Sequence, residues 1–336
     1  MRKILVAAVA AAVCAAGARA ADVITLNGAG ATFPYPIYSK WFDDYHKLKP
    51  GVQINYQSIG SGGGIRQITE RTVDFGATDG PMSDQQLADP KIKGKLLHIP
   101  TVMGAVVPVF NVAGVDSLNL SPETLAKVFL GEITRWNDPA IAKDNPSAAL
   151  PGEAITVVHR SDGSGTSFCF TDYLSKVSRD WEKKAGKGAS VNWPAGIGGK
   201  GNEGVSGLVK QTPGSIGYVE LIYAEQNKLA HAAVKNAAGK FVKASVEAVT
   251  AAAAGVKMPS DFRVSIVNAK GEKAYPIATF TWLLVHQKNT GGAGAILKDF
   301  LLWMLDEGQK SAPALGYAPL PKQVAEKARK LASTVK

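Results

Sequence analysis

Residues 160–166 read R-S-D-G-S-G-T, and this stretch decides how the chain folds around its candidate site. β-Branched residues at 155–158 precede it, and apolar residues at helical spacing follow it from Phe170 to Val177. The stretch is therefore predicted to be a turn that joins a strand to a helix. A helix N-terminus carries unpaired backbone N–H groups and the positive end of the helix dipole, so the turn is a candidate anion site.

The residue types in this turn suit an oxyanion. Its glycines allow the backbone to approach a ligand closely, and Ser164 can either cap the helix or donate its hydroxyl. Arg160 offers a planar fork of donors that matches phosphate-like groups. A capped helix beside a solvated arginine would use the same residues, so this turn alone leaves both interpretations open.

Two further turns share this chemistry. Thr32-Phe33 follows a Gly-rich segment and precedes an amphipathic helix pattern, and Ser61-Gly62-Gly63 opens another helix pattern. Strand, turn and helix alternate along the chain, which favours an α/β fold. Ligands of such folds bind at the carboxyl ends of strands. Three such turns, if they converge, would surround a small tetrahedral anion with N–H and hydroxyl donors.

Several other segments have a clear expected structure. Residues 102–112 and 277–285 are apolar and rich in β-branched residues, and they are predicted to be buried strands. The Ala-rich residues 248–254 are predicted to form an exposed helix, and residues 321–332 a basic last helix with solvated lysines.

The N-terminus reads as a targeting segment. A basic start, an apolar run from Ile4 to Ala16 and an A-x-A motif ending at Ala20 predict a signal peptide cleaved after Ala20, and therefore an exported protein. A lipid anchor at Cys14 is the alternative, although Val13 before it fits such a signal poorly. No later run reaches the roughly 18 uncharged apolar residues that a membrane-spanning helix needs.

Removal of this segment leaves 35 basic and 28 acidic residues, a formal net charge of +7. A moderately basic exported protein can attract an anionic ligand, although most of its lysines are expected simply to be solvated. Cys169 then remains as the single cysteine, so no internal disulfide can form. Its place between Phe168 and Phe170 predicts a small buried side chain.

The chain resembles the periplasmic phosphate-binding proteins of bacterial phosphate ABC transporters of the Pst type. The matching segments follow the order of that family and cover nearly all of the mature chain. They are residues 28–34 (G-A-G-A-T-F-P), 59–64 (I-G-S-G-G-G), 73–79 (V-D-F-G-A-T-D), 129–141, 160–166, 198–202 (G-G-K-G-N), 214–220 (G-S-I-G-Y-V-E) and 316–321 (G-Y-A-P-L-P).

The resemblance implies a two-domain α/β fold of the periplasmic-binding-protein type, type II-like, with two hinge strands and a ligand cleft between the domains. Domain I would comprise residues 21–103 and 274–336, and domain II residues 104–273. The hinges would lie near residues 102–104 and 274–276. The implied protein is a monomer in the periplasm that is not an enzyme and needs no cofactor. Its partners would be inorganic phosphate and the permease and ATPase subunits of the transporter.

The resemblance also assigns the ligand contacts. Hydroxyl and backbone N–H groups of Thr32 and Ser61 would donate to phosphate, as would the backbone N–H of Phe33. Arg160 would supply the charged fork, with Asp162 orienting it from behind. Asp79 would accept a hydrogen bond from the ligand. The remaining donors would be backbone N–H groups and two hydroxyls of Ser164, Gly165 and Thr166.

An acidic side chain in an anion site is understandable only if the ligand carries a proton. An ionised carboxylate accepts hydrogen bonds and donates none. Mono- or dihydrogen phosphate can donate its P–OH to Asp79, whereas sulfate at neutral pH has no proton to give. An unpaired buried polar group costs about 1–3 kcal/mol, and more when it is charged. The competing interpretation of Asp79 is a helix cap or Asx-turn at Asp79-Gly80-Pro81.

Other functions are weaker interpretations of the same residues. A hydrolase could use His159, Asp162 and Ser164, but G-x-S-x-G is absent, and His159 is expected to pack or to face solvent. A binder of sulfate or molybdate would conflict with Asp79. The five histidines show no metal-ligand spacing, and no basic-aromatic pattern indicates nucleic acid binding.

A dinucleotide enzyme is the remaining rival. Gly196, Gly198 and Gly201 form a formal GxGxxG, with Glu220 about twenty residues later. Pro194 stands where a central strand would have to be, which argues against that fingerprint. In the resembled family this stretch is a loop near the rim of the cleft.

Overall fold

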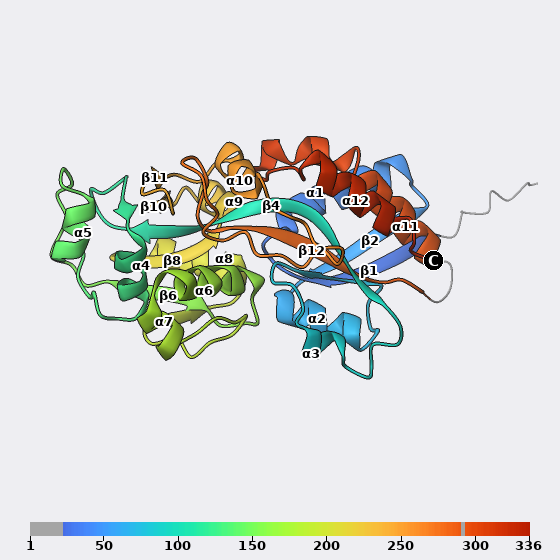
Figure 1. Cartoon of the computed structure of the whole chain (residues 1–336), viewed down its shortest axis with the longest axis horizontal. Helices are drawn as coiled ribbons and strands as arrows, with labels where there is room; N and C mark the ends of the chain where they lie inside the picture. Colours follow the sequence, from blue (N-terminus) through green and yellow to red (C-terminus); the bar gives the residue numbers. More distant parts are fainter. Residues whose placement is uncertain (1–22, 290–292) are drawn as a thin grey trace, which may run out of the picture.

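The computed structural model describes residues 23–289 and 293–336. The predicted signal peptide, its cleavage site and Cys14 lie outside these residues. Figure 1 shows an elongated molecule in which strands run through the middle and helices lie on both sides of them. Among the described helices, none has the length and hydropathy to cross a bilayer.

The strands are β1 Ile24–Gly30, β2 Val52–Ser58, β3 Phe75–Thr78, β4 Leu96–Asn111, β5 Asn119–Leu120, β6 Thr156–Arg160, β7 Ile197–Gly199, β8 Ser215–Glu220, β9 Ala230–His231, β10 Ala233–Lys235, β11 Phe241–Val242 and β12 Ala278–His286. The large sheet has the order β2-β1-β3-β12-β4-β8-β6-β7, with β9 beside β4, and a small sheet has the order β11-β10-β5.

The helices are α1 Tyr35–Leu48, α2 Ser61–Thr69, α3 Asp84–Leu87, α4 Pro122–Phe129, α5 Pro139–Asp144, α6 Gly165–Val177, α7 Arg179–Lys184, α8 Gly201–Gln211, α9 Leu221–Gln226, α10 Val246–Ala253, α11 Ala293–Met304 and α12 Lys322–Ala332, with 3-10 turns η1 Gly308–Ser311 and η2 Pro313–Leu315. We call β1, β2 and β3 with α1, α2, α3, α11 and α12 the first half. We call β6, β7 and β8 with α4, α6, α7 and α8 the second half.

β4 connects the two halves of the large sheet. Its residues up to Ala105 pair antiparallel with β12, and those from Val106 onward pair antiparallel with β8. Nearly all of β4 is buried, as expected for a continuous apolar run. The buried strand predicted at residues 102–112 is therefore the later part of a strand that begins at Leu96, and the strand predicted at residues 277–285 is confirmed as β12.

The return of the chain to the first half lies directly beside this junction. The backbone N–H of Val106 donates to Ile277 O at 2.8 Å, and Tyr275 OH donates to Val106 O at 2.9 Å. The two crossing segments are thus neighbours, close to where residues 102–104 and 274–276 were predicted to cross. Their role as hinges and the domain boundaries stay predictions.

α1 illustrates how local sequence places a turn. Pro36 stands in its first turn, where a missing N–H costs little. The buried face of α1 holds Ile37, Tyr38, Trp41, Phe42 and Tyr45. In Figure 1, α1, α11 and α12 lie on one side of the first half's strands, and α2 and α3 lie on the other. Burial of this face holds α1 against the sheet, so that its N-terminus stays close to the end of β1.

Strand direction brings the turns to two edges. β1, β2 and β3 run parallel, so the turns after Gly30, Ser58 and Thr78 follow one edge of the first half. β6, β7 and β8 also run parallel, so the turns after Arg160 and Gly199 follow one edge of the second half. The candidate site is built where these two edges meet.

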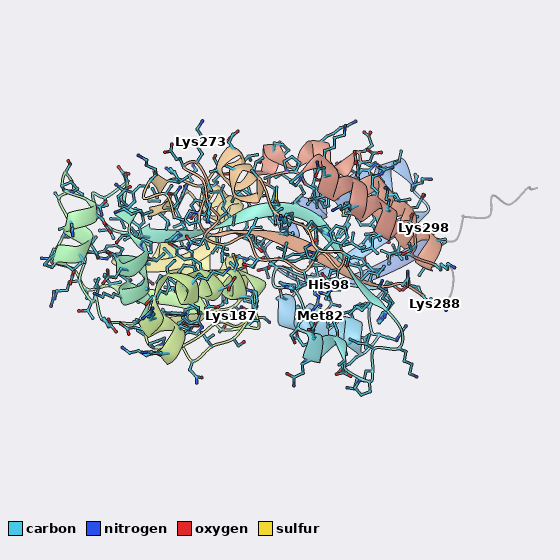
Figure 2. The ribbon with its side chains drawn as sticks, viewed as in Figure 1. Met82, His98, Lys187, Lys273, Lys288 and Lys298 are labelled. Atoms are coloured by element: carbon cyan, nitrogen blue, oxygen red, sulfur yellow. The ribbon has the colours of Figure 1, made fainter. Side chains whose placement is uncertain are left out.

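The surface agrees with only part of the sequence analysis. Lys187, Lys273 and Lys288 are exposed and lie far apart in Figure 2, and α12 exposes its lysines while it buries Val324, as predicted.

The prediction of an exposed helix at residues 248–254 is wrong. α10 occupies this stretch, but half of its residues are buried against the core. Its buried residues are Ala248, Val249, Ala252 and Ala253.

Candidate anion-binding site

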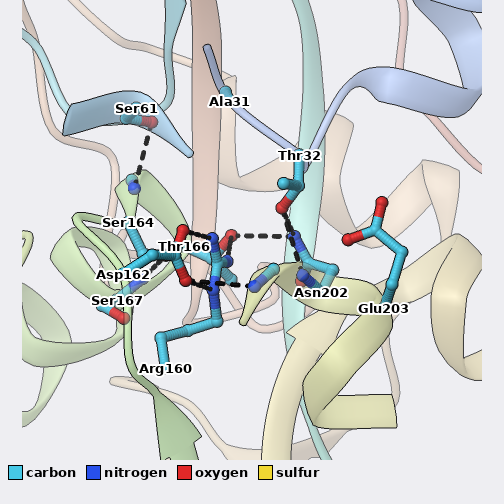
Figure 3. A network of polar contacts seen from close by, with 12 residues as sticks. Ala31, Thr32, Ser61, Arg160, Asp162, Ser164, Thr166, Ser167, Asn202 and Glu203 are labelled. Atoms are coloured by element: carbon cyan, nitrogen blue, oxygen red, sulfur yellow. Dashed lines mark hydrogen bonds and ion pairs between the residues drawn. The ribbon is translucent and has the colours of Figure 1, made fainter. Parts of the chain in front are cut away.

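The turns that open α2 and α6 contact each other across the boundary between the two halves. The backbone N–H of Gly62 donates to Gly163 O at 2.8 Å, and the backbone N–H of Gly165 donates to Ser61 Oγ at 3.1 Å. Figure 3 shows this link between Ser61 and the loop that carries Ser164. Two of the three predicted turns therefore meet, although Gly165 and Ser61 are 104 positions apart in the chain.

The third turn joins the site through Asn202, the second residue of α8. Asn202 Nδ2 donates to Thr32 Oγ1 at 2.7 Å and to Thr166 Oγ1 at 3.2 Å (Figure 3). Tyr223 OH donates to Thr32 O at 2.6 Å. Thr32, from the first half, is thus held by side chains of the second half and its neighbouring helix α9, as the predicted convergence of the turns requires.

Arg160 ends β6 and forms a two-point contact with Asp162. Its Nε donates to Asp162 Oδ1 at 2.7 Å, its second terminal nitrogen donates to Asp162 Oδ2 at 2.6 Å, and its first donates to Thr166 Oγ1 at 3.2 Å. Burial opposes ionisation of Asp162, but the hydrogen bonds and charge of Arg160 hold its pKa below the ordinary value. Arg160 is only 3% exposed, so its positive charge is fixed inside the site.

Gly165 permits the close approach of the two halves. A Cβ atom built on Gly165 would lie 2.5 Å from Ser61 Oγ and 2.6 Å from the backbone nitrogen of Asp79. Contacts this short are not tolerated, because the backbone of Asp79 cannot move aside as a flexible side chain could. The glycine in the opening stretch is therefore needed at this position for space.

Asp79 follows β3 and is 1% exposed. Its Oδ1 accepts from Thr281 Oγ1 at 2.8 Å, and its Oδ2 lies 3.5 Å from Ser61 Oγ. Burial raises the pKa of Asp79 to about 7, against the opposing effects of Thr281, Arg160 and Ser61. The interpretation of Asp79 as a helix cap or Asx-turn is wrong, because Ser83 caps α3 and the Asp79 carboxyl pairs with the side chains of Thr281 and Ser61.

Four backbone amides at this junction lack an acceptor. Within residues 23–289 and 293–336, no hydrogen bond is found for the N–H groups of Thr32, Phe33, Ser61 and Thr166. Each belongs to a predicted donor turn, and each residue is almost completely buried. The great majority of buried backbone N–H groups in proteins are paired, so four unpaired donors in one place indicate a site for an acceptor.

Ser164 differs from its prediction in one respect. Its hydroxyl caps α6 by accepting from the backbone N–H of Ser167 at 3.0 Å, which leaves the hydroxyl proton free to be donated. Its backbone N–H, expected to face the ligand, instead donates to Ala189 O at 2.9 Å. The predicted Ser164 amide donor is therefore wrong, because the preceding loop already uses that group.

Three residues of the site, Asn202, Tyr223 and Thr281, were not predicted from the sequence. Asn202 ends one of the segments that resemble the phosphate-binding family, and it stands near a helix start. The resemblance of its segment could therefore have pointed to Asn202 as a site residue. Tyr223 and Thr281 lie within apolar runs and carry no such signal. Asn202 and Tyr223 are found only when the two halves are brought together, and Thr281 only when β12 pairs with β3.

The Gly-rich stretch at residues 196–201 is not the loop that was expected. It forms β7 at the edge of the sheet, and Gly201 then opens α8. The backbone N–H of Gly201 donates to Asp162 Oδ1 at 3.0 Å, so this stretch supports the arginine–carboxylate pair.

The residues of the hydrolase alternative do not assemble a triad. His159 Nδ1 lies 3.0 Å from Arg160 O, and its ring stacks on Trp193 at 4.9 Å between centroids, so it packs as predicted. Asp162 pairs with Arg160, and Ser164 caps its helix. Cys169 is buried, as predicted.

The fold and this two-sided polar junction define a class of ligand-binding protein. Residues 15–307 match the family model described as a PBP superfamily domain. A high-affinity periplasmic phosphate-binding protein bound with phosphate aligns with a TM-score of 0.73 at 23% identity, over 91% of this chain and 93% of the other. A phosphate-binding protein from Stenotrophomonas maltophilia aligns with a TM-score of 0.67 at 20% identity, over 91% and 93%. The predicted two-domain fold of the periplasmic-binding-protein type is confirmed.

Curated relatives narrow the class to a family. The phosphate-binding protein PstS of Pasteurella multocida is 48% identical over 308 residues, which cover 90% of this chain and 88% of the relative. The PstS protein of Methanocaldococcus jannaschii is 42% identical over 330 residues, covering 91% and 85%. The chain belongs to the family of PstS phosphate-binding proteins, as its motifs predicted.

Proposed function

We propose that this protein binds inorganic phosphate between its two halves and delivers it to the permease and ATPase subunits of a phosphate ABC transporter. One observation carries the proposal. A buried carboxyl, Asp79, faces the same junction as the buried arginine Arg160 and a set of unpaired backbone donors. Membership of the PstS family supports the same conclusion.

The contacts in the site suggest how the ligand is held. Thr32, Phe33, Ser61 and Thr166 would donate their unpaired N–H groups, and Gly165 would exchange its bond to Ser61 for one to the ligand. The hydroxyl oxygens of Thr32, Ser61 and Thr166 now accept hydrogen bonds from N–H groups at the junction, and these hydroxyls would turn to the anion. Arg160, held by Asp162, would supply the positive charge. This donor set requires no metal or cofactor, and nothing in it requires a bond to be broken.

Asp79 would give the site its preference for a protonated anion. Ionised Asp79 accepts the P–OH of mono- or dihydrogen phosphate, but it has nothing to accept from fully ionised sulfate. The mismatch leaves two negative oxygens facing each other in a poorly solvated site, which costs about 1–3 kcal/mol or more. Discrimination would therefore come from a penalty on the wrong ligand.

The location and assembly state belong to the same proposal. The protein would be exported to the periplasm, lose residues 1–20 after Ala20, and act there as a monomer that is not an enzyme. Its domains would be residues 21–103 with 274–336 and residues 104–273, closing about the two crossing segments.

Titration calorimetry with phosphate and with sulfate tests this function. The wild-type protein is expected to bind phosphate far more tightly than sulfate, and Asp79→Ala is expected to narrow that difference more than it weakens phosphate binding. A wild-type protein that prefers sulfate, or an Asp79→Ala variant with unchanged selectivity, would contradict the proposal.

A further inference from the structure

Thr281 is the residue that stands directly behind Asp79. It lies on β12, which pairs with β3. The next residue on β12, Trp282, is in register with Thr78 of β3. Thr281 is fully buried, and its Oγ1 is 2.8 Å from Asp79 Oδ1 and 3.3 Å from Thr78 O. Its hydroxyl is therefore within reach of two acceptors at once, one of them the carboxyl that we propose to select the ligand.

A hydroxyl has one proton to donate and can accept in return. When Asp79 is ionised, Thr281 can donate to the carboxylate. When Asp79 is protonated on Oδ2, Thr281 can still donate to Oδ1, which is then a neutral carbonyl oxygen, and the Oδ2 proton is available to the ligand. Thr281 thus pairs with Asp79 Oδ1 in both states, which leaves Oδ2 on the side of Ser61 to meet the ligand.

We propose that Thr281 is a positioning residue for selectivity, which stabilises the ionised form of Asp79 and so sets the pH below which the site accepts an oxyanion that carries no proton. This inference rests on the proposed phosphate-binding function. Its physical basis is that a hydrogen bond to a charged acceptor is stronger than the same bond to a neutral one.

The charged and titratable groups around Asp79 are the other influences on its ionisation. Arg160 is the positive group that faces Asp79 and favours its ionised form. The remaining titratable groups whose charge would be felt at Asp79 are buried, and burial raises the pKa of each. They are Tyr38 of α1, Tyr56 of β2, Cys169 of α6, Glu220 at the end of β8, and Tyr317 after η2.

Glu220 is a second buried carboxyl near Asp79, and burial raises its pKa well above the ordinary value. The test therefore compares variants that differ only at Thr281 and leave Glu220 in place. Sulfate is the probe, because it stays unprotonated from about pH 5 to about pH 9, whereas phosphate changes its own protonation state in that range. A protonated Asp79 can donate to sulfate, so the affinity for sulfate reports the protonation of Asp79.

The expected result is a shift in a pH profile. In the wild type, the affinity for sulfate should rise as the pH falls through the pKa of Asp79. In Thr281→Val, which keeps the β-branched shape, the midpoint should move upward by about one pH unit, because the ionised carboxylate loses a hydrogen bond. Thr281→Ser restores the hydroxyl and should restore the wild-type midpoint.

Thr279→Val is the matched control. Thr279 is a buried neighbour on the same strand, but its Oγ1 contacts the backbone oxygens of Asp79 and Phe280 and not the carboxyl. Its valine variant should keep the wild-type midpoint. Equal midpoints for the wild type and Thr281→Val, or a sulfate affinity in the wild type that does not change with pH, would overturn the inference.

Two further outcomes are separable. If Thr281→Val does not fold, Thr281→Ala and Thr281→Ser give the same comparison with less bulk, and equal midpoints for those two would again refute the role of the hydroxyl. A wild-type protein that fails to bind phosphate contradicts the proposed function itself. Tight phosphate binding with an unshifted midpoint contradicts only the inference about Thr281.

Discussion

Asp79 is a carboxyl in an interior that disfavours charge. Moving a carboxylate out of water costs several kcal/mol unless partners compensate. Thr281, Arg160 and Ser61 compensate in part, and the remaining cost appears as a pKa of about 7 when the two halves are closed. The same burial that makes Asp79 discriminating therefore also makes it sensitive to pH.

The stability of the ligand-free protein should depend on pH through Asp79. Its folded pKa is raised above the unfolded value, so it stabilises the fold fully at acid pH, and that stabilisation is lost as the pH rises toward 7. Asp79→Asn cannot titrate. Its advantage over the wild type in unfolding free energy should grow by about 2–3 kcal/mol between pH 5 and pH 8, at 1.36 kcal/mol per pH unit. Urea denaturation of both proteins in phosphate-free buffer measures their unfolding free energies at each pH. If the two free energies change in parallel with pH, the prediction is refuted.

Arg160 is expected to carry much of the attraction for the ligand. Arg160→Ala removes the buried positive charge and leaves Asp162 without its partner. Phosphate binding should weaken by about 2–5 kcal/mol, as for other buried charge partners. Calorimetric titration measures the loss. Arg66→Ala, at an exposed position of α2, removes the same charge and should bind almost like the wild type. Similar affinities for both variants would mean that only net charge matters.

At the scale of elements, α2 and α6 present their N-termini to each other at close range. Neither helix could do so with a side chain at the first position of α6, because Gly165 already lies against Ser61 and Asp79. The helix dipoles and unpaired amides of both helices then point toward one small volume. Packing of each helix on its own half holds this geometry.

Gly165→Ala should separate helix stability from ligand binding. Alanine favours helix, but its Cβ would clash with the opposite half when the two halves are closed. Phosphate affinity should fall by about 1–3 kcal/mol, the usual cost of overpacking, while thermal unfolding of the ligand-free protein changes little. Both are measurable by calorimetry.

Gly207→Ala in α8 is the control for this substitution. A Cβ there meets no atom within 4 Å. It should leave binding unchanged and stabilise the fold by about 0.5–1 kcal/mol, since alanine replaces glycine inside a helix. Undiminished phosphate affinity in Gly165→Ala would show that the two halves can bind ligand at a wider separation.

At the scale of the whole molecule, two adjacent crossing segments link two halves that contact each other through polar groups. Thr32, Ser61 and Asp79 come from one half, and Arg160 and Thr166 come from the other. At the site itself the two halves are linked by hydrogen bonds between polar groups, so a ligand that satisfies its donors should favour the closed arrangement.

Solution scattering should detect this closure. The radius of gyration of the phosphate-free protein is expected to decrease when phosphate is added, because ligand contacts from both halves stabilise the closed form. Sulfate at the same ionic strength should produce a smaller change. Identical scattering profiles with and without phosphate would mean that the halves are already closed without ligand.

Much of the fold and of the site could be predicted from local sequence. The strand–turn–helix at residues 160–166, the glycine-rich turns and the buried strands each depend on neighbours in the chain, so their patterns are visible there. The error at residues 248–254 arose because alanine suits both exposed and buried helices. The edge strand at residues 197–199 was missed because glycine-rich sequence disfavours strands until a neighbour such as β6 pairs with it.

The sequence by itself determined the three donor turns, the arginine and the acid, because capping, glycine conformation and charge are properties of single residues and short segments. Only the tertiary structure decided what those groups face. It placed Ser61 against Gly165, joined Asn202 to Thr32, and set Thr281 behind Asp79. These pairs lie far apart in the chain, and the free energy that brings them together comes from burial of the two halves around β4 and β12, which no local pattern contains.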